Sequence, residues 1–175
     1  MVSQVPHQTQ FDEIFEAEFD YVCHTLRRFG VAERDVEDVA QDVFLGVHRR
    51  FQEYDPSRPV RPWLVAFAFR TASNYRRGRK RRESRAVAED AAHTGDGRAD
   101  AAQADRRRMV QSVLDQMSLE RKMILLMYDV DGHTAAEIAH VLEVPLNTVY
   151  SRIRLARREF RTLGADLFNA ESSHG

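Results

Sequence analysis

A predicted helix, tight turn and second helix between residues 133 and 158 constrain the fold more than any other part of this chain. Thr134 and Glu137 have the spacing of a capping box, in which each side chain satisfies a free backbone amide at the start of a helix. Only Glu143 and Val144 separate the two segments, which leaves room for a turn alone. Hydrophobic residues recur at helical spacing in both segments. The stretch therefore predicts a helix-turn-helix.

The second helix of this unit has an apolar face and a cationic face. Its predicted buried stripe is Val149, Ile153, Ala156 and Phe160. Five arginines fall within ten residues, and only Glu159 opposes them. Such a helix can lie in a DNA major groove with its polar side chains against base edges and phosphates, although the pattern also fits the solvated face of a helical bundle. The polar face carries Asn147, Ser151, Arg152, Arg154 and Arg158.

The composition excludes several classes of protein. Hydrophobic residues make up 43% and charged residues 30% of the 175 residues, as in ordinary globular proteins of one domain or two small ones. No apolar run approaches the ~20 residues that span a membrane, and the N-terminus lacks a signal-peptide pattern, so we expect no membrane insertion and a cytoplasmic location. The single cysteine, Cys23, excludes an intramolecular disulfide. Because no metal-ligand spacing, nucleophile–base pair or phosphate-cradling loop is present, we expect no metal, no cofactor and no enzymatic activity.

The net charge of −1 hides a strong asymmetry along the chain. The segment from Gln10 to Asp42 has ten acidic and three basic residues, whereas the segment from Arg70 to Arg85 has eight basic residues and one acidic residue. Charges segregated in this way indicate different partners for different surfaces.

Two amphipathic helices are predicted before residue 51. The first has apolar residues from Phe11 to Leu26 and ends near Gly30, after a frayed tail at residues 1–10. The second covers residues 34–50, with a buried stripe formed by Val36, Val39, Ala40, Val43, Phe44 and Val47. Its outer face carries Glu37, Asp38, Gln41, Asp42 and Leu45. Acids near a helix start favour the helix dipole, but a leucine on the same face also fits a protein-binding surface.

A third helix is predicted to start at Pro62 and to run into a basic segment at residues 76–82. Four polar residues share one face of this helix: Arg70, Asn74, Arg77 and Arg81. Aromatic residues lie in the same helix: Trp63, Phe67, Phe69 and Tyr75. Cations beside flat rings suit single-stranded nucleic acid, because cations contact phosphates while rings stack on bases. The alternative, which we favour for Phe67 and Tyr75, is that the rings belong to the core.

Residues 86–105 differ from the rest of the chain. They are rich in Ala, Asp and Gly and have no apolar period, which predicts a flexible acidic linker. The chain is thereby predicted to be all-α, with small helical domains at residues 1–85 and 106–175 and the helix-turn-helix in the second. Domains of this size have marginal cores, so we expect each to depend on a partner.

Three blocks of the sequence resemble, in the same order, those of bacterial RNA polymerase sigma factors of the extracytoplasmic-function (ECF) group. Residues 35–45 resemble the family's polymerase-clamp-binding helix, D-x-E-D-x-x-Q-[ED]-x-F. Residues 61–64, Arg-Pro-Trp-Leu, resemble the start of the region that melts the promoter and reads the −10 element. Residues 114–158 resemble the family's second domain and include the string P-x-x-T-V-x-S-R at residues 145–152.

The resemblance implies a transcription initiation factor that binds core RNA polymerase and promoter DNA, with an anti-sigma protein as a further partner. The residues that it assigns to polymerase binding are Asp38, Gln41, Asp42 and Leu45. Those that it assigns to the −10 element are Trp63, Arg70, Asn74, Arg76, Arg77 and Arg81. Those that it assigns to the −35 element are Asn147, Thr148, Ser151, Arg152, Arg154 and Arg158.

The sequence departs from the family pattern at three positions. Arg70 stands where the family often has the Asn of a pocket for a flipped −10 base. Glu143 stands at the turn where the family usually has Gly, and a left-handed backbone there costs roughly 1–2 kcal/mol. Tyr150 takes a place often held by Lys or Arg, which weakens phosphate contact.

Two other classes of function fit parts of the pattern. A stand-alone helix-turn-helix regulator would bind specific duplex DNA unaided, whereas a sigma factor binds well only with core polymerase. A polymerase-binding adaptor that never reads DNA would leave the basic helix and the arginine-rich helix unexplained.

Overall fold

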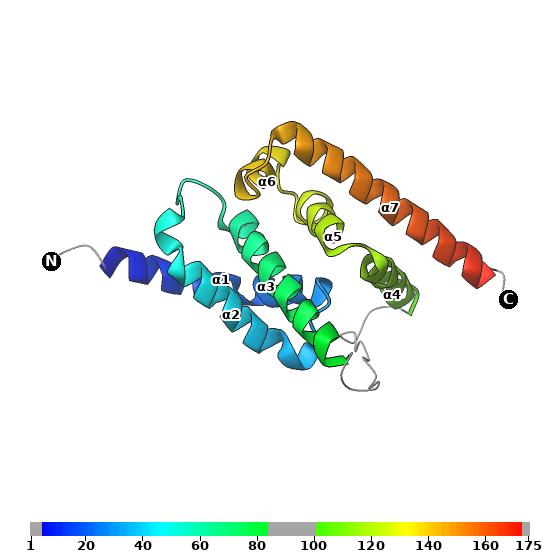
Figure 1. Ribbon diagram of the computed structural model, residues 1–175, viewed down its shortest axis with the longest axis horizontal. Coiled ribbons are helices and arrows are strands. Elements are labelled where there is room, and N and C mark those ends of the chain that lie inside the picture. The colour runs from blue at the N-terminus through cyan, green and yellow to red at the C-terminus, as the bar shows by residue number, and fades with distance from the viewer. Residues whose placement is uncertain (1–4, 84–100, 173–175) are drawn as a thin grey trace. The chain divides into compact units, whose positions relative to one another are not determined.

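The computed structural model describes residues 5–83 and 101–172, and within these ranges every regular element is helical (Figure 1). Contacts divide the chain into two compact units, Met1–Ala91 and Ala92–Gly175. The first contains α1 (Val5–Arg28), η1 (Glu33–Asp35), α2 (Val36–Arg49), η2 (Phe51–Glu53) and α3 (Val60–Glu83). The second contains α4 (Ala101–Gln116), α5 (Leu119–Leu125), the π-helical η3 (Leu126–Val130), α6 (Ala135–Val141) and α7 (Leu146–Ser172). The predicted all-α fold is confirmed.

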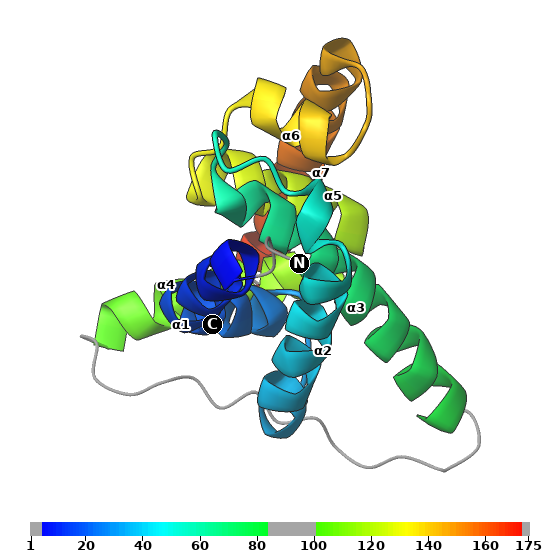
Figure 2. The ribbon, with the colours of Figure 1, turned by 90° about the vertical axis from the view of Figure 1, so that its left-hand side faces the viewer.

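The core of the first unit lies between α1, α2 and α3, which contact one another in every pair (Figure 2). The six residues predicted to form the buried stripe of α2 are all buried. Three phenylalanines of α1 surround Phe44 of α2, with ring centroids 6.5, 4.9 and 6.0 Å from it: Phe11, Phe15 and Phe19. Burying one such ring stabilises the fold by about 1.5–3 kcal/mol. This packing fixes α2 with its polar face outward.

The first helix ends where the sequence predicts but begins earlier. Gly30 has a φ of 83°, its N–H donates to the carbonyl of Arg27 (2.9 Å), and the N–H of Val31 donates to the carbonyl of Leu26 (3.1 Å). These two bonds form a Schellman motif, which requires the left-handed residue that glycine provides. Because α1 already includes Val5, the prediction of a frayed tail before Phe11 is wrong from that residue onward.

The third helix crosses the second at close range. A Cβ atom at Gly46 would lie 3.2 Å from Cδ1 of Phe67, so a larger residue at this position would require the Phe67 ring to shift by a few tenths of an ångström. α3 begins at Val60, two residues before the predicted start. Of its predicted core residues, Leu64, Ala68 and Ala72 are buried, whereas Phe67 and Tyr75 are half-buried. Its basic end therefore carries few buried anchors.

The second unit begins within the segment that we predicted to be linker. α4 starts at Ala101, so the linker prediction is wrong for residues 101–105, and residues 84–100 lie outside the described part of the chain. Alanine and glutamine, which have high helix propensity, explain the difference, because they support a helix without an apolar period. The domain boundaries at residues 85 and 106 stay a prediction.

The predicted helix-turn-helix is present as α6 and α7. Thr134 and Glu137 form the capping box: the N–H of Glu137 donates to Oγ1 of Thr134 (3.2 Å), and the N–H of Thr134 donates to Oε2 of Glu137 (2.7 Å). α7 begins at Leu146, and the carbonyl of Pro145 accepts the N–H of Thr148 (2.9 Å). Val149, Ile153 and Ala156 are buried and Phe160 is half-buried. α7 continues to Ser172, so the prediction of a frayed tail from Asn169 is wrong up to that residue.

Glu143 has a φ of 53°, the left-handed conformation that the sequence analysis considered. A non-glycine residue in that region costs roughly 1–2 kcal/mol, while glycine costs about 0.5–1 kcal/mol of additional backbone entropy on folding. We therefore expect Glu143→Gly to raise the free energy of unfolding of the second unit by roughly 0.5–1 kcal/mol. Glu143→Ala removes the same side chain but keeps the backbone strain, so it should give no increase. Hydrogen exchange of the α6 and α7 amides measures both variants, and an equal gain in both would contradict a backbone origin.

Candidate polymerase-binding and nucleic-acid surfaces

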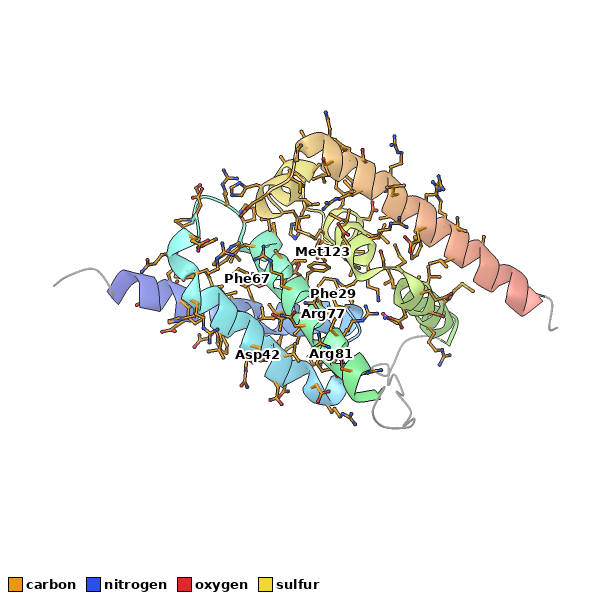
Figure 3. All side chains as sticks on the ribbon, in the orientation of Figure 1. Phe29, Asp42, Phe67, Arg77, Arg81 and Met123 are labelled. Carbon is orange, nitrogen blue, oxygen red and sulfur yellow. The ribbon has the colours of Figure 1, made fainter. Side chains whose placement is uncertain are left out.

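The outer face of α2 combines acids with one apolar side chain. The four residues that we predict to bind polymerase are all exposed: Asp38, Gln41, Asp42 and Leu45. For Leu45, 55% of the surface is accessible. Their spacing is i, i+3, i+4 and i+7, so they form one stripe along the helix. Figure 3 labels Asp42 on this side of α2. Chemically, the stripe suits a protein surface that offers cations around an apolar contact.

The exposed face of α3 carries the predicted −10 residues. Arg70, Asn74, Arg76, Arg77 and Arg81 are all exposed, and Figure 3 labels Arg77 and Arg81 along the helix. A guanidinium N–H of Arg77 donates to Oδ1 of Asn74, one turn earlier. This bond occupies the amide oxygen of Asn74, and the NH₂ group of an amide carries two donors that suit a base or a phosphate. The face therefore combines cations that can follow a phosphate backbone with one amide that can hydrogen-bond to a base.

Trp63, also predicted to contact the −10 element, belongs to an aromatic cluster. Its ring stacks on Tyr54 at a centroid distance of 5.2 Å and an angle of 23°, and it meets the edge of Phe67 at 5.1 Å. Phe51 extends the cluster at 5.7 Å from Tyr54. Trp63 remains half-buried, so the cluster supports one side of the ring and leaves part of it accessible. The indole is thus held rigidly at the start of α3.

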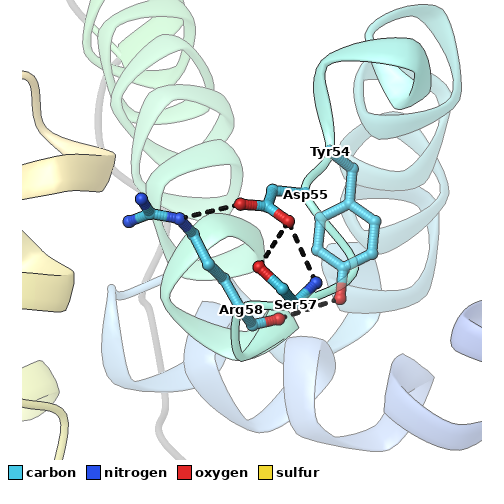
Figure 4. Close-up of polar contacts among 4 residues, drawn as sticks. All are labelled: Tyr54, Asp55, Ser57 and Arg58. Atoms are coloured by element: carbon cyan, nitrogen blue, oxygen red, sulfur yellow. Dashed lines mark hydrogen bonds and ion pairs between the residues drawn. The ribbon is translucent and has the colours of Figure 1, made fainter.

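The loop that precedes α3 is ordered by its own side chains (Figure 4). Oδ1 of Asp55 accepts the backbone N–H of Ser57 (3.0 Å) and its hydroxyl (2.6 Å), while Nε of Arg58 donates to Oδ2 of Asp55 (3.0 Å). The hydroxyl of Tyr54 donates to the carbonyl of Arg58 (3.1 Å). The Ser57 hydrogen bonds, followed by Arg58, lower the pKa of the Asp55 carboxyl group. Sequence reasoning recognised this stretch as a loop but missed its order, for which the Asp-Pro-Ser spacing was the available signal.

The outward face of α7 holds most of the predicted −35 residues. Asn147, Ser151, Arg154 and Arg158 are exposed and Thr148 is half-buried. Arg152 lies on the flank of the helix toward α5, where its Nη1 is 3.2 Å from Oε1 of Glu120. The structure therefore brings four of the six residues together and places Arg152 beside a carboxylate. To reach a base, Arg152 must leave this ion pair.

Two further charged residues of α7 stabilise the second unit. Nε of Arg157 donates to Oδ2 of Asp129 (3.0 Å), its guanidinium lies 5.2 Å from the ring centroid of Tyr128, and the Asp129 hydrogen bond raises the pKa of Arg157. Glu159 accepts a hydrogen bond from Arg121. Arg157 therefore anchors α7 to η3, although it is one of the five clustered arginines that favour a nucleic-acid partner in the sequence.

A groove of about 670 Å³ lies between α4, η3 and α7. Its floor is apolar and includes Leu114, Leu126 and Ile153, and its rim carries Arg154, Arg157 and Arg161. Tyr150, which the sequence analysis treated as a weakened phosphate contact, lines this groove with 53% of its surface accessible. Sequence reasoning missed the groove because its walls come from three separate segments, at residues 110–114, 125–130 and 150–161.

Within the described residues, no cluster of three or more histidine, cysteine, aspartate or glutamate side chains could hold a metal ion. In the same ranges, no helix is both long and apolar enough to cross a membrane.

Comparison with known proteins gives the class of protein. Residues 14–82 match the family model "Sigma-70 region 2", and residues 107–160 match "Sigma-70, region 4". The ECF RNA polymerase sigma factor SigK of Mycobacterium ulcerans is 33% identical, over 85% of this chain and 84% of the relative. RNA polymerase sigma factor NccH of Alcaligenes xylosoxydans xylosoxydans is 28% identical, over 89% of this chain and 87% of the relative.

A solved structure is similar in fold to this chain. CnrH, in complex with the cytosolic domain of CnrY, is 25% identical with a TM-score of 0.61, over 89% of this chain and 88% of that chain. The two matched regions together define sigma factors of the sigma-70 class, which direct RNA polymerase to promoters. The chain belongs to the ECF group of RNA polymerase sigma factors, and the resemblance in its sequence is confirmed.

Proposed function

We propose that this sigma factor divides its contacts among three helical faces. The outer face of α2 binds core polymerase, the exposed face of α3 binds the −10 element, and the outward face of α7 binds the −35 element. The observation that carries the proposal is the separation of charge within the first unit: an acidic stripe with Leu45 on α2, and exposed arginines with Asn74 on α3. A protein surface with cations around an apolar contact complements the first face, and the phosphate backbone of DNA complements the second.

The chemistry of initiation belongs to the polymerase in this proposal. The chain supplies binding and duplex opening and performs no reaction of its own, so we propose that it is not an enzyme. It acts where the bacterial polymerase acts, which supports a cytoplasmic location.

An anti-sigma protein is the further partner that we propose. CnrH was solved with the cytosolic domain of CnrY, which supports a similar complex for this chain. The apolar groove between α4, η3 and α7 offers a docking surface, because its arginine rim complements an amphipathic segment with acidic flanks. If an inhibitor docks there, Val130→Glu should relieve inhibition while transcription without inhibitor persists.

Transcription in vitro tests the promoter-directing function directly. We expect purified chain and core polymerase together to initiate at specific sites in a genomic DNA library, and neither component to do so alone. Full-length chain without polymerase should show only weak binding to duplex carrying the −35 sequence. Tight, sequence-specific binding by the chain alone would favour the stand-alone helix-turn-helix regulator instead.

A further inference from the structure

A tyrosine of α3 is bonded to the residue that precedes α2. The hydroxyl of Tyr75 donates to Oδ2 of Asp35 at 2.6 Å, across 40 positions of sequence, and the bond is partly buried. The backbone of Ala32 and the side chain of Arg79 also hydrogen-bond to this hydroxyl. Burial, followed by the Asp35 bond, raises the pKa of Tyr75, so the phenol keeps its proton near neutral pH. The hydroxyl is therefore the centre of a polar cluster.

Asp35 occupies the N-cap position of α2, yet its side chain makes no capping hydrogen bond to that helix. Aspartate is among the preferred N-cap residues because its carboxylate can accept the free amides of the first turn. Here the carboxylate bonds to Tyr75 instead, with Arg34 3.8 Å away. The Asp35 carboxylate therefore joins the start of α2 to α3 and does not cap its own helix.

The bond is placed where α3 has few other anchors. Ala72 is the last buried residue of α3 among those whose side chains are described. Figure 2 shows the C-terminal end of α3 running away from α2. Tyr75 lies between Asn74 and Arg76, both exposed, and so fixes the rotation of α3 at the residues that face solvent.

We propose that the Asp35–Tyr75 hydrogen bond is a positioning contact that holds Asn74 and the arginines of α3 in place relative to polymerase-bound α2 while the −10 duplex opens. The inference rests on the proposed roles of α2 and α3. Tyr75 touches neither polymerase nor DNA in this scheme and acts through its neighbours. Without the bond, the end of α3 samples more orientations, and the captured strand loses part of its binding free energy.

Tyr75→Phe tests the contact because it removes only the hydroxyl. We expect the affinity for core polymerase to stay within twofold of wild type and open-complex formation on duplex promoter to fall at least fivefold. On a promoter that is already unpaired at the −10 element, the defect should shrink to within twofold. Asp35→Ala should reproduce the defect. Asp35→Asn keeps an acceptor for the Tyr75 hydroxyl, so it should retain most of the wild-type open-complex formation. Tyr21→Phe, at another half-buried tyrosine of the same unit, is the matched control.

Asn74→Ala, measured in parallel, separates this inference from the proposed function. Because both variants act on the same strand contact, their effects on opening should be less than additive in the double variant. If Asn74→Ala lowers opening and Tyr75→Phe does not, the positioning role is overturned while the −10 face stands. If neither variant lowers opening, the assignment of the α3 face fails as well. Equal losses in opening and in core affinity after Tyr75→Phe would overturn the inference in favour of a purely structural contact.

Discussion

Replacing Asp38 and Gln41 together with alanine should lower the affinity for core RNA polymerase at least tenfold. Both side chains are exposed on α2, and the buried stripe of the same helix is untouched. Each central polar contact in a protein interface contributes on the order of 1–2 kcal/mol, so two losses correspond to about 30- to 900-fold in affinity. Binding to immobilised core polymerase measures the effect, and the thermal unfolding midpoint should change little.

The matched control is Glu16→Ala with Asp20→Ala, two exposed acids of α1 in the same unit. The control removes two negative charges, whereas the test variant removes only one. A loss of affinity caused by net charge alone would therefore be larger in the control. Affinity for core should remain near wild type. An unchanged affinity in the Asp38 and Gln41 variant, or an equal loss in the control, would remove the α2 face from the polymerase interface.

The local features of the fold could be predicted because their causes are local. The buried stripe of α2 follows from helical periodicity, and the box of Thr134 and Glu137 follows from capping chemistry three residues apart. Gly30 marks the end of α1 because a Schellman motif needs a left-handed residue. Helix starts without such signals were missed at Val5 and Ala101. At Ala101, alanines of high helix propensity extend the helix beyond its apolar pattern, whereas the residues that follow Val5 are mostly poor helix formers and gave no local signal.

The features that the sequence could not reveal depend on distant partners. The Tyr75–Asp35 bond joins residues 40 positions apart, and the groove of the second unit needs three elements to assemble. The arginines of α7 show the same limit. Their sequence pattern is uniform, but Arg157 bonds to Asp129 and Arg152 pairs with Glu120, whereas other arginines of the helix face solvent. A sequence shows which residues are charged, but it does not show with which residue each of them pairs.

The second large effect concerns sequence reading by α7 and α3. An arginine that bonds to guanine with both arms of its guanidinium contributes roughly 1–3 kcal/mol of discrimination, whereas an arginine on phosphate contributes affinity without sequence preference. Ser151 and Arg154 lie near the start of α7, the part of a recognition helix that meets base edges. We expect Ser151→Ala and Arg154→Ala to weaken initiation about five- to hundredfold on promoters with the preferred −35 sequence and much less on the others.

Other variants should give different signatures in the same experiment. Asn74→Ala should change the preference at the −10 element, because its amide faces the melted strand in our proposal. Arg81→Ala should weaken all promoters alike and reduce the slope of log affinity against log salt by about one. Arg77→Ala should have the same effect on the salt slope, together with some change in the −10 preference, because it also removes the hydrogen bond to Asn74. The measurement is initiation from a matrix of −10 and −35 variants at two salt concentrations.

Arg152 provides the sharpest test within this matrix, because its ion pair with Glu120 competes with any contact to DNA. If Arg152 reads bases, as the sequence predicts, Glu120→Gln should free it and strengthen initiation on the preferred −35 sequence. Arg152→Ala should then abolish that gain and lower initiation in a −35-dependent way. If Arg152 only braces α7 against α5, both variants should weaken all promoters evenly and lower the stability of the second unit. If Arg154→Ala also lowers initiation equally on all −35 variants, neither arginine discriminates among bases. The arginines of α7 would then bind phosphates only.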